Sequence, residues 1–382
     1  MATKSKEQII KECVGIDIAK DDFKICYMVM TSDLRAVVKS SKSFDNNAKG
    51  IEDFIKYIKL KSSSDFSKIT LIVEATGVYY ESLAYATFEA GFDIKVILPN
   101  RTNSYAKSFS NNSKTDKLDA KLLATYGLER GNTEKKWNPG SPKTLEMKRL
   151  CRERNTLIEL RTATQNRIHA LSHSHSPLED TKKRQQDLVD LYDEQIKEIE
   201  QSIKKLIASD DSIKQKVALM TSIPGVGEIT AAVILSETDG FALFTSIKQL
   251  IRYAGYDVVH AESGSSIHKK TRISKKGNSH IRGALHFPAM TAVTYNPIFK
   301  DFKDRIFART SIKMKGYTAV QRKLLCLMYC LVKSNKMYDP AIHLKRVEGK
   351  SGHESNKKVE NIKNENICTE NENNKKAEML LQ

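Results

Sequence analysis

The sequence predicts an α/β N-terminal domain, a long helical linker and a mainly helical C-terminal domain. Strand-like and helix-like patterns alternate through the first third of the 382 residues. Residues from about 141 to 216 then form long, charged, amphipathic patterns that predict paired helices. The segment from 217 to about 340 has helical spacing again. A chain of this length exceeds what one small core needs, so two or three domains are expected.

The first third opens with two apolar runs separated by a polar turn, which predicts a β-hairpin. The expected strands are CVGIDIAK, FKICYMVM, ITLIVEATG and DIKVILP, and the expected helices are KGIEDFIKYIKL and YYESLAYATFEAG. Gly77 and Pro99 end the last two strands, and Gly91 ends the second helix. Strands that alternate with helices after an opening hairpin imply a mixed sheet covered by helices.

Composition shifts predict the domain boundaries. A Pro-Gly-Ser-Pro stretch at 139–142 resembles a hinge, and the two linker helices are expected to break near HSHSPLED as a coiled-coil-like hairpin. Beyond Ile342 the chain is almost entirely Lys, Asn, Glu and Ser, which predicts a disordered tail. The expected domains are residues 10–138 (α/β catalytic domain), 139–215 (helical linker), 216–340 (C-terminal domain) and 341–382 (tail).

The charge of the chain predicts a polyanionic partner. The formal net charge is +17 and the pI is about 9.4, and Lys or Arg near phosphate releases condensed counterions. The charged N-terminus has no apolar signal core, and no run is long and apolar enough for a membrane span. The six cysteines form no CxxC pair, which fits a reducing compartment. We therefore expect a soluble protein of the cytoplasm, with no membrane contact.

Four carboxylates form the candidate metal site. Asp17 interrupts an apolar strand, and Glu74 ends another, at the edge where side chains of an α/β sheet reach a cleft. Asp116 and Asp119 are spaced i, i+3, so they share one helical face. Four acids from two strands and a helix suit hard divalent ions such as Mg²⁺, which stabilise the oxygens of a phosphodiester during cleavage. The alternative is that each acid is an ordinary surface residue.

A glycine loop in the second half predicts a phosphate contact. TSIPGVGEITAAVILSE places Gly225 and Gly227 between two helices, which is the helix-hairpin-helix pattern. Glycines there allow backbone N–H groups at a helix N-terminus to approach a DNA phosphate. A plain turn between two helices with glycine caps is the alternative.

A Ser- and Gly-rich loop followed by basic residues is the second candidate DNA contact. Its serines are Ser263, Ser265 and Ser266. The basic residues that follow are Lys269, Lys270, Arg272, Lys275, Lys276 and Arg282. A serine in such a loop could serve as a nucleophile toward a phosphate whose charge is neutralised nearby. The pattern alone is also typical of a loop that only contacts DNA or solvent.

In combination, these motifs resemble one bacterial family. They are GIDIAK, IVEATGVYYESLAYATFEAGFDIKVILPNR, KTDKLDAKLLATYG, IPGVGEITAAVILSE and SGSS followed by RISKKGNSHIRGAL. The chain is thereby identified as similar to the DEDD transposases and recombinases of insertion sequences, a group that includes the pilin-gene invertase. We expect the members of this group to be serine transposases. The resemblance runs in order from about residue 13 to 338. The KTDxxDAxxLA and RISKxGNxxxR motifs are specific, whereas GIDIAK alone is not.

The resemblance implies an RNase H-like (RuvC-like) N-terminal domain whose DEDD acids are Asp17, Glu74, Asp116 and Asp119, with Mg²⁺ or Mn²⁺ as cofactor. It also implies a serine nucleophile, and counting back from Arg272 gives Ser263, with Ser265 and Ser266 left open. Members of the family assemble as homodimers and homotetramers, with the metal site of one subunit facing the serine of another. Some are directed by a structured guide RNA, so DNA and such an RNA are the expected partners.

The predicted function is therefore an insertion-sequence transposase or site-specific recombinase that forms a phosphoserine link to DNA. Arg272, Lys275, Lys276 and Arg282, with Gly225 and Gly227, are the expected DNA contacts. One alternative is a RuvC-like junction resolvase in which water is the nucleophile. A sugar-kinase or actin-like ATPase would need later Gly-rich nucleotide loops, which the sequence does not contain. A non-catalytic nucleic-acid binder is the remaining alternative.

Overall fold

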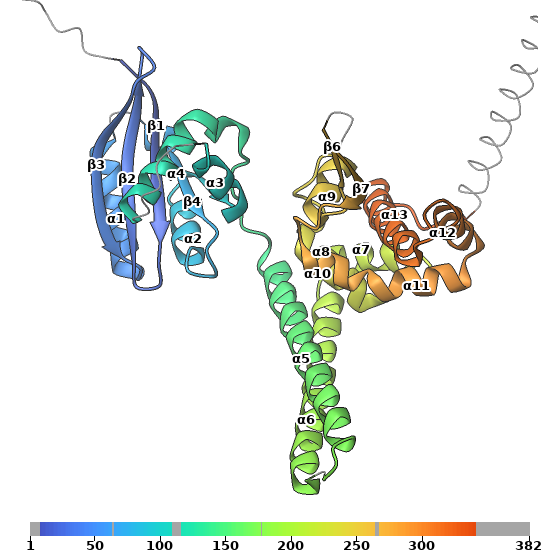
Figure 1. The fold of residues 1–382 in the computed structure, drawn as a ribbon. Helices are drawn as coiled ribbons and strands as arrows, with labels where there is room; N and C mark the ends of the chain where they lie inside the picture. Colours follow the sequence, from blue (N-terminus) through green and yellow to red (C-terminus); the bar gives the residue numbers. More distant parts are fainter. Residues whose placement is uncertain (1–7, 63–64, 109–115, 177, 264–266, 341–382) are drawn as a thin grey trace, which may run out of the picture. The chain divides into compact units, whose positions relative to one another are not determined.

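The computed structural model describes residues 8–62, 65–108, 116–176, 178–263 and 267–340 (Figure 1). The chain divides into two compact units, Met1–Pro139 and Gly140–Gln382. The predicted disordered tail, residues 341–382, lies outside the described residues. Among the described residues, every helix is either too short or too polar to span a lipid bilayer.

Five strands form one mixed sheet in the first unit. They are β1 (Ile9–Ile18), β2 (Asp22–Thr31), β3 (Ala36–Asp45), β4 (Thr70–Glu74) and β5 (Asp93–Ile97). The strand order is β3-β2-β1-β4-β5. β2 runs antiparallel to both β1 and β3, whereas β1, β4 and β5 run parallel. The opening hairpin and the mixed sheet are as the sequence predicts.

β3 is an edge strand that the sequence did not reveal. Its sequence, AVVKSSKSFD, is rich in Ser and Lys, and most of its residues are exposed or half-buried. A polar edge strand lacks the apolar alternation by which a strand is recognised, and exposed Lys residues discourage pairing with another chain.

Helices cover both faces of this sheet (Figure 1). They are α1 (Ala48–Lys61), α2 (Glu81–Glu89), α3 (Pro99–Ala106) and α4 (Asp116–Arg130), with short 3-10 turns at Phe66–Lys68 and Gly131–Thr133. α1 and α2 pack on one face of the sheet and share a core with Ile16. α4 packs on the other face, against Cys13 and Ile72. The sequence predicts no helix at α3, because Pro99 there is typical of a strand end. In the structure Pro99 occupies the first turn of a new helix.

The linker is a pair of long helices, α5 (Pro142–Ser172) and α6 (Glu179–Ala208), which lie side by side (Figure 1). Buried residues on α6 recur at heptad spacing, at Val189, Ile196 and Ile203. Two cross-helix ion pairs support the hairpin: Arg154 with Glu200 at 2.7 Å, and Arg161 with Asp193 at 2.5 Å. The predicted helical hairpin with a break between residues 173 and 178 is thus present.

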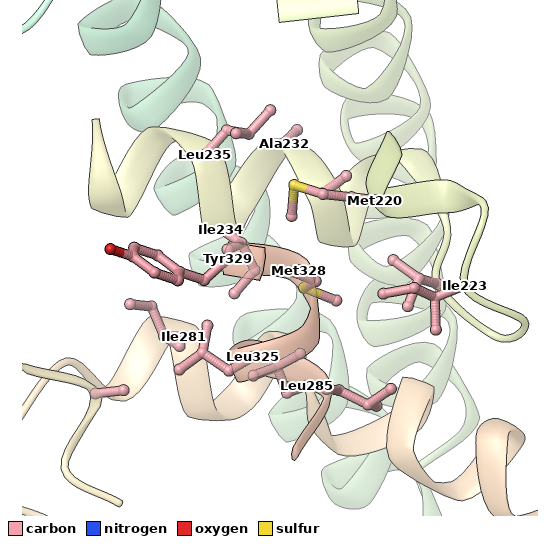
Figure 2. Close-up of a cluster of buried hydrophobic side chains, with 14 of the residues drawn as sticks. Met220, Ile223, Ala232, Ile234, Leu235, Ile281, Leu285, Leu325, Met328 and Tyr329 are labelled. Atoms are coloured by element: carbon pink, nitrogen blue, oxygen red, sulfur yellow. The ribbon is translucent and has the colours of Figure 1, made fainter. Parts of the chain in front are cut away.

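The rest of the second unit is mainly helical. Its helices are α7 (Asp211–Thr221), α8 (Glu228–Thr238), α9 (Ile247–Ala254), α10 (Ser279–Ala284), α11 (His286–Tyr295), α12 (Pro297–Thr310) and α13 (Lys313–Ser334). Figure 2 shows the core between them, where Leu235 of α8, Ile281 of α10 and Met328 of α13 are fully buried or nearly so. The start of α5 contributes Met147 and Cys151 to the same core.

An antiparallel hairpin of β6 (Val258–Ser263) and β7 (Ile267–Ile273) interrupts the helices of the second unit. The sequence predicts only a loop here. Ser, Gly and Lys dominate the segment and hide its strand pattern.

Candidate active site

Asp17 and Glu74 lie at the same end of two neighbouring strands. β1 and β4 are parallel, and their register pairs Gly15 with Ile72. Asp17 and Glu74 each follow two residues later, so along both strands they point to the face that Gly15 and Ile72 occupy. Both acids are half-buried. The sheet therefore brings the first two predicted acids to one edge and one face.

Two glycines bring helix α4 onto that face. A Cβ atom at Gly15 would overlap the backbone oxygen of Ala120, and one at Gly127 would overlap Sγ of Cys13. The early part of α4 thus lies over residue 15 of β1, and the later part lies over residue 13. α4 therefore runs antiparallel to β1, with its first turn toward the strand end that carries Asp17.

Asp116 and Asp119 occupy this first turn. Asp116 is the first residue of α4, and the side chain of Asp119 is half-buried. The side chain of Asp116 lies outside the described part of the structure. A helix N-terminus favours negative charge, which offsets part of the repulsion between the two acids. The backbone places all four predicted acids at the same end of the same face of the sheet.

Two further residues lie close to these acids, and the sequence does not reveal either of them. Thr102 of α3 is buried, and its hydroxyl donates a close hydrogen bond to Oε2 of Glu74. Lys24 of β2 is paired in register with Asp17, so the cation and the acid share one face of the sheet. Neither residue stands in a recognisable motif. Lys24 is placed beside Asp17 by the register of the β1–β2 hairpin, and Thr102 contacts Glu74 from a helix that begins 25 residues further along the chain.

The donor set suits a hard divalent ion. All four predicted ligands are carboxylates, and oxygen ligands of this kind are those that Mg²⁺ and Mn²⁺ prefer. Within the described residues, no three His, Cys, Asp or Glu side chains already form a group that could hold a metal. The side chain of Asp116 is not among the described ones. The chemistry and the shared face therefore fit a metal ion held by the four acids together.

The predicted nucleophile lies at the end of the β6–β7 hairpin. Ser263 is the last residue of β6 and pairs with Ile267 of β7. Its side chain lies outside the described part of the structure, as do residues 264–266, which include Ser265 and Ser266. The choice among the three serines is therefore still a prediction.

The predicted basic contacts follow this hairpin. Arg272 lies on β7 and is exposed, as are Lys275 and Lys276 in the next turn. Lys275 has a positive φ of 53°, which bends the chain toward α10. These three cations are available to solvent, which is compatible with phosphate contact, and their role remains a prediction.

Arg282 has a structural task in the same region. Its Nη1 donates hydrogen bonds to the backbone oxygens of Ala254 (2.9 Å), Gly277 (3.1 Å) and Asn278 (3.2 Å). The guanidinium thereby joins the end of α9 to the loop before α10. Its predicted contact with DNA would come in addition to this role.

A buried acid, Glu237, connects three segments of the second unit. It is 1% exposed, and Arg152 of α5 donates to both carboxylate oxygens, at 2.7 and 3.0 Å. The side-chain amide of Asn278 donates to the same carboxylate at 2.7 Å. Burial raises the pKa of Glu237, but the hydrogen bonds from Arg152 and Asn278 and the charges of Lys148 and Arg152 together hold the pKa below its ordinary value. The sequence does not reveal this acid, because VILSETDG resembles an ordinary helix end.

The glycine loop between α7 and α8 contains one position with a positive φ, which glycine adopts readily. Gly225 has a φ of +91°, and Gly227 is the N-cap of α8 without a side-chain cap. Both are exposed, and Glu228 follows in the first turn of the helix. The two helices and their glycine turn are present as predicted, whereas their assignment as a helix-hairpin-helix for DNA remains a prediction.

Comparison with known proteins shows where the chain belongs. Residues 14–177 match the DEDD domain of IS110, described as a transposase, and residues 217–304 match the domain described as "Transposase IS116/IS110/IS902 family". The pilin gene-inverting protein of Moraxella bovis is 31% identical over 339 residues, which cover 87% of this chain and 99% of that protein. The chain belongs to the IS110 family of transposases.

Two further likenesses accompany this IS110 assignment. A 43.6 kDa protein of insertion element IS110 from Streptomyces coelicolor is 26% identical over 121 residues, 32% of this chain and 30% of that protein. The RuvC structure of Thermus thermophilus covers 33% of this chain and 99% of its own, at 12% identity and a TM-score of 0.25. A likeness with so low a TM-score says nothing about substrate or mechanism.

Membership of the IS110 family confirms that the chain is an enzyme of the transposase and recombinase class. It also corrects the description of the family. The matched domain is named for its DEDD acids, not for a serine, so "serine transposase" is not what the family is. A serine nucleophile is a separate hypothesis about mechanism.

Proposed function

We propose that this IS110 family member cuts and exchanges DNA strands with a RuvC-like DEDD site and a serine nucleophile. The observation that carries the proposal is the convergence of Asp17, Glu74 and the first turn of α4 on one face of the sheet. Acids gathered at one edge repel one another unless a cation joins them, so their arrangement favours function over accident.

The four acids would hold Mg²⁺ or Mn²⁺. Such an ion, when bound, stabilises negative charge on the oxygens of a phosphodiester. The contribution of the chain would be to hold the acids in place: β1 and β4 carry Asp17 and Glu74, and close packing of α4 holds the helical turn to which Asp116 and Asp119 belong. Lys24, beside Asp17, would offset part of the remaining negative charge when the site is empty.

Ser263 would supply the nucleophile. Its hydroxyl oxygen attacks phosphorus and loses its proton, a phosphoserine bond forms, and the bond from phosphorus to one deoxyribose oxygen breaks, that oxygen taking up a proton. Attack by the hydroxyl of another strand then releases the serine and rejoins the DNA, so no external energy is needed. The location of Ser263 at the end of a hairpin followed by exposed cations supports this role.

The partners follow from the family. DNA is the proposed substrate, and a structured guide RNA, a homodimer and a homotetramer are proposed from the resemblance. The surplus of positive charge supports a nucleic-acid partner of either kind.

The decisive experiment is the capture of a covalent protein–DNA adduct on a suicide substrate. With Ser263→Ala we expect no adduct, because the attacking oxygen is gone, while Ser265→Ala and Ser266→Ala retain it. Asp17→Asn should lower strand cleavage by orders of magnitude without unfolding the chain. The readouts are adducts on denaturing gels and cleaved ends on sequencing gels.

Two outcomes would contradict parts of the proposal. Adducts that persist in Ser263→Ala and vanish in Ser265→Ala or Ser266→Ala would move the nucleophile. Cleavage by the unmodified protein without any adduct would favour the alternative function, a RuvC-like resolvase or endonuclease in which water attacks.

A further inference from the structure

The carboxylate of Glu74 is contacted by a hydroxyl group at each oxygen. Thr76 donates to Oε1 at 3.4 Å, and Thr102 donates a closer bond to Oε2. The two donors differ in their surroundings, because Thr76 is exposed and Thr102 is only 4% exposed. A buried hydrogen bond to a charged acceptor is the stronger of the two, since water does not compete for it.

The position of Thr102 is restricted by its helix. α3 begins at Pro99, directly after β5, and Thr102 lies one turn into it. Threonine is branched at Cβ and has few rotamers within a helix. A second acceptor, the backbone oxygen of Pro99, is 3.0 Å from Oγ1. The hydroxyl has one proton, and the charged carboxylate of Glu74 is the better acceptor for it.

Hydrogen bonds and a ring contact connect α3 to α4, the helix that carries the other pair of acids. Arg101 and Tyr126 both donate close hydrogen bonds to Glu134, and Tyr105 donates to Glu129 at 2.8 Å. The rings of Tyr105 and Tyr126 meet edge to face at 5.1 Å. Burial, followed by its bond to Glu134, raises the pKa of Tyr126 to about 12, so this donor keeps its proton at neutral pH.

We infer that Thr102 is a positioning residue for Glu74. Its hydroxyl fixes one carboxylate oxygen and, through α3, couples the orientation of Glu74 to the helix of Asp116 and Asp119. The inference rests on the proposed function, in which Glu74 is a metal ligand. Hydrogen bonds that orient a ligating carboxylate govern metal affinity, and their loss weakens binding about 10- to 100-fold.

The test is a calorimetric titration of the full chain with Mn²⁺ alone. Thr102→Val keeps the shape and removes the donor, and we expect the Kd for Mn²⁺ to rise at least about tenfold. Thr102→Ser restores the hydroxyl and should bind within a few-fold of the unmodified protein. Thr102→Ala also removes the donor, without adding a methyl group beside the carboxylate. This variant is used in place of Thr102→Val if Thr102→Val does not fold.

Thr87 provides a matched control. It is fully buried, and its hydroxyl donates to the backbone oxygen of Leu83 within its own helix. Thr87→Val is the same chemical change away from the acids, so we expect unaltered Mn²⁺ affinity even if thermal stability falls.

Each outcome of the titration has a distinct meaning. Unchanged Mn²⁺ affinity in folded Thr102→Val or Thr102→Ala overturns the inference, while loss of binding in Glu74→Gln leaves the proposed metal site standing. Absence of Mn²⁺ binding in the unmodified protein, or unchanged binding in Glu74→Gln, overturns the proposed metal site and the inference with it. An equal loss of affinity in Thr87→Val would show that the effect is only structural.

Discussion

At the scale of single residues, Glu237 shows how a buried charge can organise a folded unit. Its carboxylate has 1% exposure, and it accepts hydrogen bonds from Arg152 of the linker and Asn278 of the loop before α10. The same loop contains Gly277, where a Cβ atom would overlap the backbone of Tyr253. The KGN part of the RISKKGN motif thus has structural reasons for its Gly and Asn, independent of any contact with DNA.

The charge of Glu237 predicts a specific dependence of stability on pH. Its pKa in the folded chain is below the ordinary value of 4.5, so its contribution is fully present above that pH and is lost as the pH falls through the lower, folded value. Glu237→Gln should therefore reduce the free energy of unfolding by about 2 kcal/mol at pH 7, since it removes charge-assisted hydrogen bonds. Urea titrations at several pH values measure this difference, which should narrow below pH 4.5. If the difference in free energy of unfolding between the unmodified protein and Glu237→Gln grew toward low pH, the carboxylate of Glu237 would not stabilise the fold in its charged form.

At the scale of elements, the close approach of α4 to the sheet depends on two glycines. Side-chain atoms at Gly15 would overlap the backbone of Ala120 and Ala124, which cannot rotate away. At Gly127 the obstacles are Sγ of Cys13 and, at 2.6 Å, Cγ1 of Ile72. The packing that brings the first turn of α4 toward the end of β1 therefore requires glycine at both positions.

Gly15→Ala should accordingly push α4 away from β1. We expect the free energy of unfolding to fall by about 3 kcal/mol, because overpacking against backbone has no cheap relief. Thermal or urea unfolding measures the change, and strand cleavage should fall with it because Asp116 and Asp119 move. Gly283→Ala is the control, since a Cβ atom there meets nothing within 4 Å and the residue is helical. Equal stability of the two variants would show that α4 does not pack closely on β1.

At the scale of the whole molecule, the positive charge is concentrated in one part of the chain. Residues 267–340 contain 16 Lys and Arg but only three Asp and Glu, so they account for most of the net charge of +17. This stretch begins with β7 and includes Arg272, Lys275 and Lys276. Electrostatic attraction to nucleic acid should therefore come mainly from the C-terminal part of the second unit.

Neutralising cations in this stretch should weaken DNA binding in a salt-dependent way. Arg305 and Arg309 are exposed on α12, and the double change to Gln should reduce the slope of log K against log salt concentration by up to about 0.9 per lost phosphate contact. Lys49 and Lys61, exposed on α1, serve as the matched control pair, with little effect expected. Fluorescence anisotropy at several salt concentrations measures both. A larger effect from the control pair would place the DNA surface on the first unit.

The strongly patterned elements were predictable from local sequence. The β1–β2 hairpin and the long linker helices have periodic apolar residues, and each pattern is complete within its own segment. β3 and the β6–β7 hairpin were not predictable, because polar residues fill both and only pairing with a neighbour makes them strands. α3 was hidden by Pro99, which both ends strands and begins helices.

The family, the four candidate acids and the i, i+3 spacing of Asp116 and Asp119 can be read from the amino-acid sequence, because motifs and helical periodicity are local properties. Two features depend on how the chain folds: Asp17 and Glu74 share a face with the start of α4, and Thr102 contacts Glu74 across 28 residues. The fold also lets Glu237 accept a hydrogen bond from Arg152, 85 residues away. Such contacts follow from how helices pack on a sheet and on one another, which no single segment of the chain specifies.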